Sequence, residues 1–196
     1  MTNSFQTLAA QLVAAAFVVL CACLLTFAID ALTHPYLPAM SAGRISLFYL
    51  PHGVKVILAW MFGWLSLAAV LPVTLIYAMW YLGPENFTWT MAAIVVLKGA
   101  MVPLGFELTK LMGLDLRRCD GSGLRWRQLF IVGFITSVMN QMIRYSMKCC
   151  GTLSVDEQLF SIGGGIFADI MGLLAIMVAA MLFFRWLRNA QLQRVF

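Results

Sequence analysis

Apolar stretches long enough to cross a lipid bilayer recur from one end of this 196-residue chain to the other. A helix needs about 20 consecutive apolar residues to span the hydrocarbon core of a membrane. Apolar side chains make up 62% of the sequence and charged side chains only 11%, whereas soluble domains hold about 45–50% and about 25%. A water-soluble globule could not cover so many apolar side chains. We therefore expect an integral membrane protein of the all-α class.

We predict six membrane-spanning helices, which form a single integral membrane domain over the whole chain. The apolar stretch 45–81 is too long for one crossing, and Gly63 with Trp64 near its middle predicts a tight reversal. Pro51 and Gly53 predict a break near the start of the second helix. The expected spans are approximately 8–29, 46–63, 65–82, 88–112, 128–146 and 159–187. They leave no room for a folded aqueous domain such as a kinase, a nuclease or a cyclase.

Basic residues predict the orientation, because the cytoplasmic loops of membrane proteins carry an excess of Lys and Arg. With both termini inside, the cytoplasmic side holds Arg117, Arg118, Arg125, Arg127, Arg185, Arg188 and Arg194. The opposite side holds Arg44 and Lys148, with Arg144 near a helix end. We therefore expect both termini in the cytoplasm and the chain in the inner membrane of a bacterium. The net charge of +5 then reflects this topology, and we expect no nucleic-acid partner.

Polar side chains inside the spans are the candidates for function, because each charge costs at least about 2.5–3.5 kcal/mol at mid-bilayer. In the span 128–146 such residues recur every three or four positions and form one stripe along the helix: Gly133, Thr136, Ser137, Asn140, Gln141, Arg144 and Lys148. Lipid cannot solvate this stripe. It must face other helices or a water-filled cavity.

Depth and helical phase bring polar residues of four spans together in the outer half of the bundle. This set is His52, Lys55, Lys98, Asn140, Gln141, Arg144 and Asp169. It holds up to three fixed positive charges, whereas Asp169 is its one negative charge. A bundle interior seldom holds such a surplus unless something anionic compensates it. The pattern predicts an outward-facing pocket for a small anion, such as a carboxylate or a phosphate, in which Asp169 orders the cations.

Within this predicted pocket, Lys55, Lys98 and Arg144 are expected to contact the anion. His52 and Asn140 are expected to orient it. An interior network is the alternative interpretation: the aspartate pairs with Lys98 or Arg144, while Lys55 extends toward the surface.

Other residues of the spans have predicted structural roles. Glu107 and Lys110 are three residues apart, and we expect them to form an ion pair. Helix breaks or close helix packing are expected at Pro51, Gly53, Pro103, Gly163, Gly164, Gly165 and Gly172. The sequence has no nucleophile–base pair, no metal-ligand spacing and no phosphate loop. We expect no enzyme activity, no metal and no cofactor. The redox state of Cys149 and Cys150 stays open.

Two segments carry a resemblance to a known family. The residues FYLPHGVK at 48–55 are followed by an apolar run to a Gly-Trp pair, and the Gly-rich segment 164–174 includes an aspartate. Both segments resemble the membrane-associated sensor domains of bacteria, known as the MASE type. The matching positions are Pro51, Gly53, Asp169 and Gly172.

This resemblance implies a sensor module. Members of that family usually form the input of histidine kinases or diguanylate cyclases. About ten residues follow the last predicted span. We therefore expect no output domain, and signalling through another membrane or cytoplasmic protein.

Two other functions are compatible with a six-span chain that has an outward pocket. One resembles the substrate-binding S components of energy-coupling-factor importers, and the small residues Ala10, Ala14, Ala15 and Ala22 could then contact a partner subunit. Such a small-residue face is also typical of ordinary helix packing. The other is a non-catalytic structural subunit of a larger membrane complex.

Overall fold

The protein is all-helical in the part of the chain that its computed structural model describes, residues 2–33, 35–36, 46–113, 126–148 and 155–192. Its elements are α1 (Thr2–Thr33), α3 (Leu50–Phe62), η1 (Gly63–Leu65), α4 (Ser66–Leu82), η2 (Pro84–Asn86), α5 (Trp89–Leu111), α6 (Trp126–Lys148) and α7 (Val155–Leu192). These described residues include no strand. The predicted all-α class is confirmed.

Four helical stretches are long and apolar enough to cross a membrane: Gln6–Thr33, Leu50–Leu82, Trp89–Leu111 and Gln158–Asn189. The chain is therefore a multi-pass membrane protein. The fifth long helix, α6, has 23 residues but is more polar, because it carries the predicted stripe. Each of the six predicted ranges holds one α-helix, and α3 begins at Leu50 rather than at residue 46.

The chain reverses its direction between α3 and α4, as the Gly-Trp pair predicts. Gly63 has φ of 60°, a left-handed conformation that glycine adopts without steric cost, and the 3-10 turn η1 follows it. Tyr49 and Tyr77, at the two ends of this segment, line the same cavity. A continuous helix would separate them by about 42 Å. The stretch Leu50–Leu82 is thus two helices that fold back on each other.

Helix α3 lies at the centre of the packing. It contacts α1, α4, α5, α6 and α7. Val54 and Leu58 on one side of α3 pack into an apolar cluster with α1 and α4. Val56 and Ala59 on the other side pack into a second cluster with α5, α6 and α7. The short α3 therefore joins two halves of the bundle.

Helices α3 and α7 touch at the level of their backbones. The Tyr49 amide donates a hydrogen bond of 3.0 Å to the Ala168 carbonyl of α7. A Cβ atom at Gly172 would collide with the Tyr49 backbone, and one at Gly53 would lie 2.9 Å from the Gly172 carbonyl oxygen. Only glycine allows this approach at both positions.

The helix break considered for the segment Gly163–Gly165 is absent, because α7 runs without interruption from Val155 to Leu192. In a membrane no water replaces lost backbone hydrogen bonds, which favours an intact helix. Gly163 is exposed, and an added Cβ there would meet nothing within 4 Å. Pro103 is likewise buried inside an uninterrupted α5.

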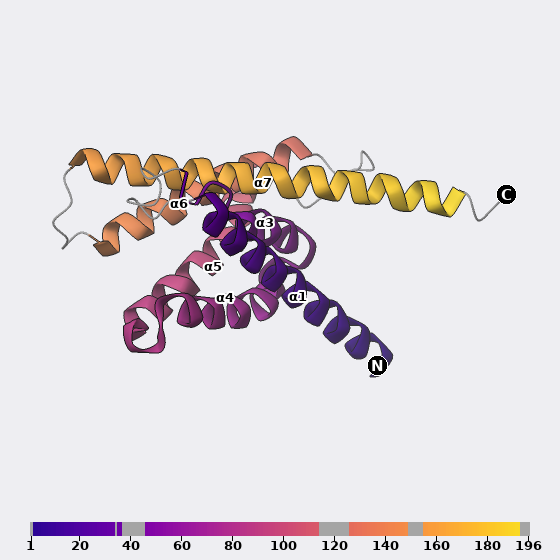
Figure 1. Ribbon diagram of the computed structural model, residues 1–196. Helices are drawn as coiled ribbons and strands as arrows, with labels where there is room; N and C mark the ends of the chain where they lie inside the picture. Colours follow the sequence, from indigo (N-terminus) through magenta and orange to yellow (C-terminus); the bar gives the residue numbers. More distant parts are fainter. Residues whose placement is uncertain (1, 34, 37–45, 114–125, 149–154, 193–196) are drawn as a thin grey trace.

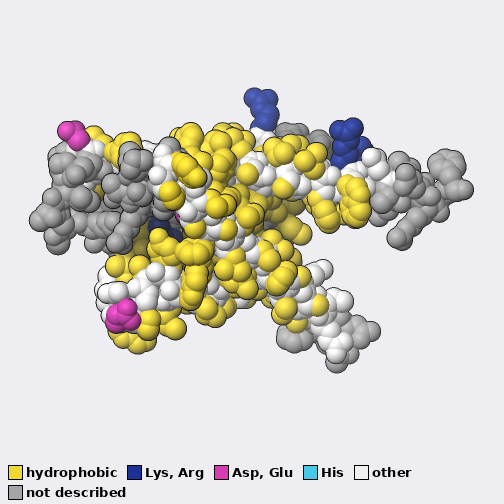
Figure 2. Space-filling view, viewed as in Figure 1, with side chains coloured by type: hydrophobic (Ala, Val, Ile, Leu, Met, Phe, Trp, Pro, Cys, Tyr) yellow, Lys and Arg dark blue, Asp and Glu magenta, His cyan; other side chains and the backbone are white. Residues whose placement is uncertain are grey.

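The outer surface is largely apolar over the helical body (Figure 2). Glu85 in η2 and Asp156 at the start of α7 are exposed at one end of the molecule, whereas Arg185 and Arg188 are exposed near the end of α7. Both termini lie on the right in Figure 1. An apolar belt between oppositely charged ends is the surface expected of a protein surrounded by lipid.

Candidate functional site

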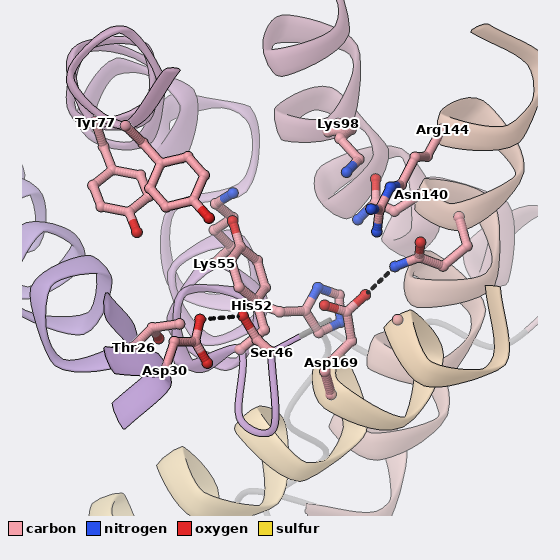
Figure 3. Close-up of a pocket in the computed structure, with 15 residues that line it drawn as sticks. Thr26, Asp30, Ser46, His52, Lys55, Tyr77, Lys98, Asn140, Arg144 and Asp169 are labelled. Carbon is pink, nitrogen blue, oxygen red and sulfur yellow. Dashed lines mark hydrogen bonds between the residues drawn. The ribbon is translucent and has the colours of Figure 1, made fainter. Parts of the chain in front are cut away.

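A polar cavity of about 220 Å³ lies inside the bundle, and each of the six α-helices in the described part of the chain contributes to its wall (Figure 3). The structure brings to this one cavity all seven residues assigned to an anion pocket: His52, Lys55, Lys98, Asn140, Gln141, Arg144 and Asp169. Their role in binding stays a prediction. The rest of the wall consists of Thr26, Asp30, Ser46, Tyr49, Tyr77, Tyr81, Gly165 and Ala168.

The polar stripe of α6 forms one wall of the site, and its part from Gly133 to Gln141 is buried, as its position in a membrane helix requires. Thr136 and Ser137 are fully buried, and Asn140 and Gln141 are 7% and 5% exposed. The Thr136 hydroxyl donates to the Val132 carbonyl of its own helix. The stripe thus faces the neighbouring helices rather than lipid.

Asp169 on α7 is held by hydrogen bonds from α6. The Ser137 hydroxyl donates to Asp169 Oδ2 at 2.8 Å, and Gln141 Nε2 donates to the same oxygen at 3.4 Å. Gly165, one turn before Asp169, leaves the space that the Gln141 amide occupies, because a Cβ there would lie 2.6 Å from it. One form of the interior-network interpretation pairs Asp169 with Arg144. In the described part of the chain no ion pair joins these two residues, and this form is not observed.

His52 connects α3 to α6. Its Nε2 lies 3.0 Å from the Gly133 carbonyl oxygen. Because a carbonyl oxygen only accepts, this nitrogen carries a proton and donates the hydrogen bond. The His52 side chain is 1% exposed. Sequence reasoning gave His52 the role of orienting a ligand, and the structure adds a bond between two helices.

The first turn of α3 lies beside the cavity and is capped by other helices. The Leu50 amide donates to Thr26 Oγ1 of α1 at 3.2 Å, and Pro51 has no amide hydrogen to satisfy. No side chain next to the helix start caps it. Because buried amides need partners, α1 and α7 together fix the start of α3 and with it the positions of Tyr49, His52 and Lys55.

Three cationic side chains line the cavity from three different helices, and each is half-buried: Lys55 of α3, Lys98 of α5 and Arg144 of α6. Lys55 Nζ lies 5.9 Å from the centre of the Tyr49 ring, within the range of a cation–π contact. Figure 3 shows Lys98 and Arg144 on the same side of the cavity, beside Asn140.

Asp30 at the end of α1 is a second carboxylate in the wall, which the sequence analysis did not assign to the site. The Ser46 hydroxyl donates to Asp30 Oδ2 at 2.6 Å. The wall therefore has three cations against two carboxylates, rather than three against one. Three buried oxygens in the described structure lack a hydrogen-bond partner: Asp30 Oδ1, Asn140 Oδ1 and Gln141 Oε1.

The other unassigned wall residues follow a signal that the sequence does contain. Thr26 and Asp30 are four residues apart on α1, and Tyr77 and Tyr81 are four residues apart on α4. Residues with this spacing share one helix face. The rings of Tyr77 and Tyr81 stack with centres 6.0 Å apart.

Several predicted features lie elsewhere or outside the described residues. Glu107 is half-buried and Lys110 exposed on α5, and their ion pair stays a prediction. Residues 114–125 of the basic loop, and both Cys149 and Cys150, lie outside the described residues. Within the described part, no group of three or more His, Cys, Asp or Glu residues could hold a metal ion.

Comparisons with models of protein families, with curated proteins and with solved structures found no match for this chain.

Proposed function

We propose that this chain binds a small anionic molecule from the outer side of a bacterial inner membrane and passes the signal to a partner protein. The observation that carries the proposal is the convergence of Lys55, Lys98 and Arg144 on one cavity. Charges buried without compensation are costly in a bundle interior. An anion among these three side chains would offset the charge that remains after the two carboxylates.

The size of the cavity supports a small ligand. Its volume of about 220 Å³ lies above the roughly 150 Å³ of an engineered cavity that holds benzene. It lies below the range of about 300–1,000 Å³ typical of sites for drug-sized molecules. A carboxylate or a phosphate ester with a few further atoms is therefore the expected class.

The position of the cavity supports access from the outside. Its wall uses the end of α1, the end of α4, the last part of α6 and the first part of α7. In the orientation that the basic residues favour, these parts lie toward the outer surface. Arg127, Arg185 and Arg188 lie at the opposite ends of α6 and α7.

A sensory role is supported by the position of the two segments that resemble MASE-type domains. Segment 48–55 and segment 164–174 meet at the crossing of α3 and α7, where the Tyr49 amide bonds the Ala168 carbonyl. His52 and Asp169 from these segments line the cavity. A ligand there would contact both helices, and α7 continues to residue 192, where a cytoplasmic partner could detect its movement.

The test is a titration of the purified chain in detergent with phosphate, acetate and succinate, with thermal unfolding as the readout. We expect at least one anion to raise the unfolding temperature in a saturable way. Arg144→Met should abolish this effect, and the control variant Arg188→Met, which removes an exposed cation, should retain it. Equal responses of the two variants, or no response of the unmodified chain, would contradict the proposal.

A transport assay separates the sensor from the importer subunit. A sensor binds the anion without accumulating it in proteoliposomes, whereas an S component accumulates substrate together with its ATPase partners. Capture of the tagged chain from native membranes then identifies the partner. A stoichiometric assembly without any bound small molecule would instead support a structural subunit.

A further inference from the structure

Asp30 lies on one side of the cavity, which we name the acidic side, and Lys98 with Arg144 lies on the opposite side, the basic side, whereas Lys55 and Asp169 do not follow this division. Figure 3 shows Asp30 next to Thr26 and Ser46 on one side, and Lys98 with Arg144 on the other. The acidic side comes from α1, the residues before α3 and the end of α4, whereas the basic side comes from α5 and α6. A simple anion would use only the basic side.

One carboxylate oxygen on the acidic side has no hydrogen-bond donor. Ser46 donates to Asp30 Oδ2, but Asp30 Oδ1 is buried without a partner, and the described residues form no ion pair with Asp30. A buried carboxylate oxygen without a donor is costly, and a simple carboxylate ligand has no N–H or O–H group to supply one. The rings of Tyr77 and Tyr81 line the cavity from the same side. Aromatic faces attract cations.

We infer that the ligand of this cavity is a zwitterion, with a primary ammonium group at Asp30 and an anionic group at Arg144 and Lys98. The anionic half rests on the proposed function, and the ammonium half is new. The ammonium group donates to Asp30 Oδ1 and lies near the tyrosine rings. Further N–H or O–H groups of the ligand donate to Asn140 Oδ1 and Gln141 Oε1, which are also buried without partners.

Two sources share this chemistry. A free amino acid or a related small molecule carries an ammonium group and a carboxylate, and the headgroup of phosphatidylethanolamine carries an ammonium group and a phosphate. Lipid molecules surround the protein, so the experiment must distinguish a headgroup from a soluble zwitterion.

The experiment compares matched probes on the unmodified full chain in detergent by calorimetric titration. The probes are the ω-amino acids from glycine to 5-aminovalerate, each with the carboxylate that lacks its amine and the amine that lacks its carboxylate. We expect the zwitterion of matching length to bind at least about tenfold more tightly than both of its partners, which corresponds to about 1.4 kcal/mol.

Two variants and one control assign the two charges. Asp30→Asn should lower the affinity for the zwitterion about tenfold and leave the affinity for the plain carboxylate unchanged. Arg144→Met should lower both affinities. The control Glu85→Gln removes an exposed carboxylate and should change neither. If Asp30→Asn does not fold, the comparison of probes on the unmodified chain still decides.

The outcomes separate the two proposals. A carboxylate that binds as tightly as its ω-amino derivative would overturn the zwitterion and leave the proposed anion site intact. Binding of no probe at all would overturn both. Nanodiscs then identify the source: binding that is lost in phosphatidylethanolamine but kept in phosphatidylglycerol assigns the site to the headgroup. Equal binding in both assigns the site to a soluble zwitterion.

Discussion

Asp169, the buried carboxylate of α7, and the cations around it differ in the contacts that the protein provides for their charges. Asp169 accepts two hydrogen bonds from α6, whereas Lys55 has a ring contact with Tyr49 and no ion pair within the described residues. A carboxylate with hydrogen-bond partners stabilises the fold, whereas a half-buried cation that forms no ion pair loses solvation without full compensation. The two residues therefore affect stability in opposite directions when the ligand is absent.

Asp169→Asn should lower the stability of the ligand-free chain by about 1–3 kcal/mol, because hydrogen bonds to a charged acceptor are lost and the cations lose a counter-charge. Lys55→Met should leave the stability unchanged or raise it, because a costly buried charge is replaced by an apolar side chain of similar length. Thermal unfolding in detergent measures both. Similar losses in the two variants would favour the interior network over a ligand site.

His52→Ala should destabilise the chain without any ligand present. The substitution removes the hydrogen bond to the Gly133 carbonyl and leaves a cavity between α3 and α6. The Gly133 carbonyl keeps the Thr136 hydroxyl as a donor, so the lost hydrogen bond costs about 0.5–1.5 kcal/mol, and the cavity adds to this loss. The matched measurement is the unfolding temperature of the variant Lys98→Met, because Lys98 also lines the cavity. If His52→Ala unfolds at the temperature of the unmodified chain, the bond does not hold the two helices together.

Single residues explain which part of the site the sequence could predict. The stripe of α6 and the central charges at Lys55, Lys98 and Asp169 were predictable, because lipid cannot solvate them and their helical phase fixes a common face. Asp30 was not, since a charge near the end of a span is ordinary. Tyr49 and Tyr81 were not predictable either, since tyrosine near the end of a span is ordinary at a membrane interface. Tyr49 reaches the cavity through its amide hydrogen bond to the Ala168 carbonyl of α7, and Tyr81 reaches it because α4 folds back beside α3.

At the scale of the helices, the packing of α3 on α7 is the contact on which the cavity depends. It combines a backbone hydrogen bond with two glycines, Gly53 and Gly172, that let the helices touch. The sequence predicted close packing or a break for every glycine of α7 without distinguishing them. Helical phase alone cannot tell a glycine at a crossing from one on an open face, because that depends on which helix lies opposite.

Gly172→Ala and Gly163→Ala form a matched pair on the same helix. Gly172→Ala should destabilise the chain by about 1–3 kcal/mol, because its Cβ collides with the Tyr49 backbone and overpacking costs this much. Gly163→Ala should be neutral or stabilising by up to about 1 kcal/mol, because alanine favours a helix and nothing lies opposite. Thermal unfolding of both variants in detergent decides, and the reverse order would contradict the observed crossing.

For the whole molecule, the number of membrane crossings determines on which side the cavity opens. The sequence predicted the six helical ranges and the reversal at Gly63, since apolar length and a turn-forming glycine are local signals. It could not decide whether α3 and α6 cross by themselves. Helix α3 has 13 residues, about 20 Å, which is shorter than the hydrocarbon core of about 30 Å. The backbone amides at its start donate hydrogen bonds to α1 and α7 instead of to water.

Two topologies then differ at one accessible position, η2. With six crossings, α3 and α4 form a hairpin that returns to the outer side, and Glu85 faces outward together with Asp156. If only the four apolar stretches cross the membrane, the stretch Leu50–Leu82 makes a single crossing. Glu85 then faces the cytoplasm. The reversal at Gly63, and the cavity that joins Tyr49 to Tyr77, favour six.

Labelling of single cysteines in a cysteine-free background tests this topology in intact cells. Glu85→Cys should react with a membrane-impermeant maleimide as readily as Asp156→Cys, because both positions are exposed and lie outside when six helices cross. Arg188→Cys should react only after the membrane is opened, because the predicted orientation places the basic end of α7 in the cytoplasm. Protection of Glu85→Cys alone would indicate four crossings. The end of α4 would then face the cytoplasm, and the tyrosines of the cavity would receive their ligand from the inner side.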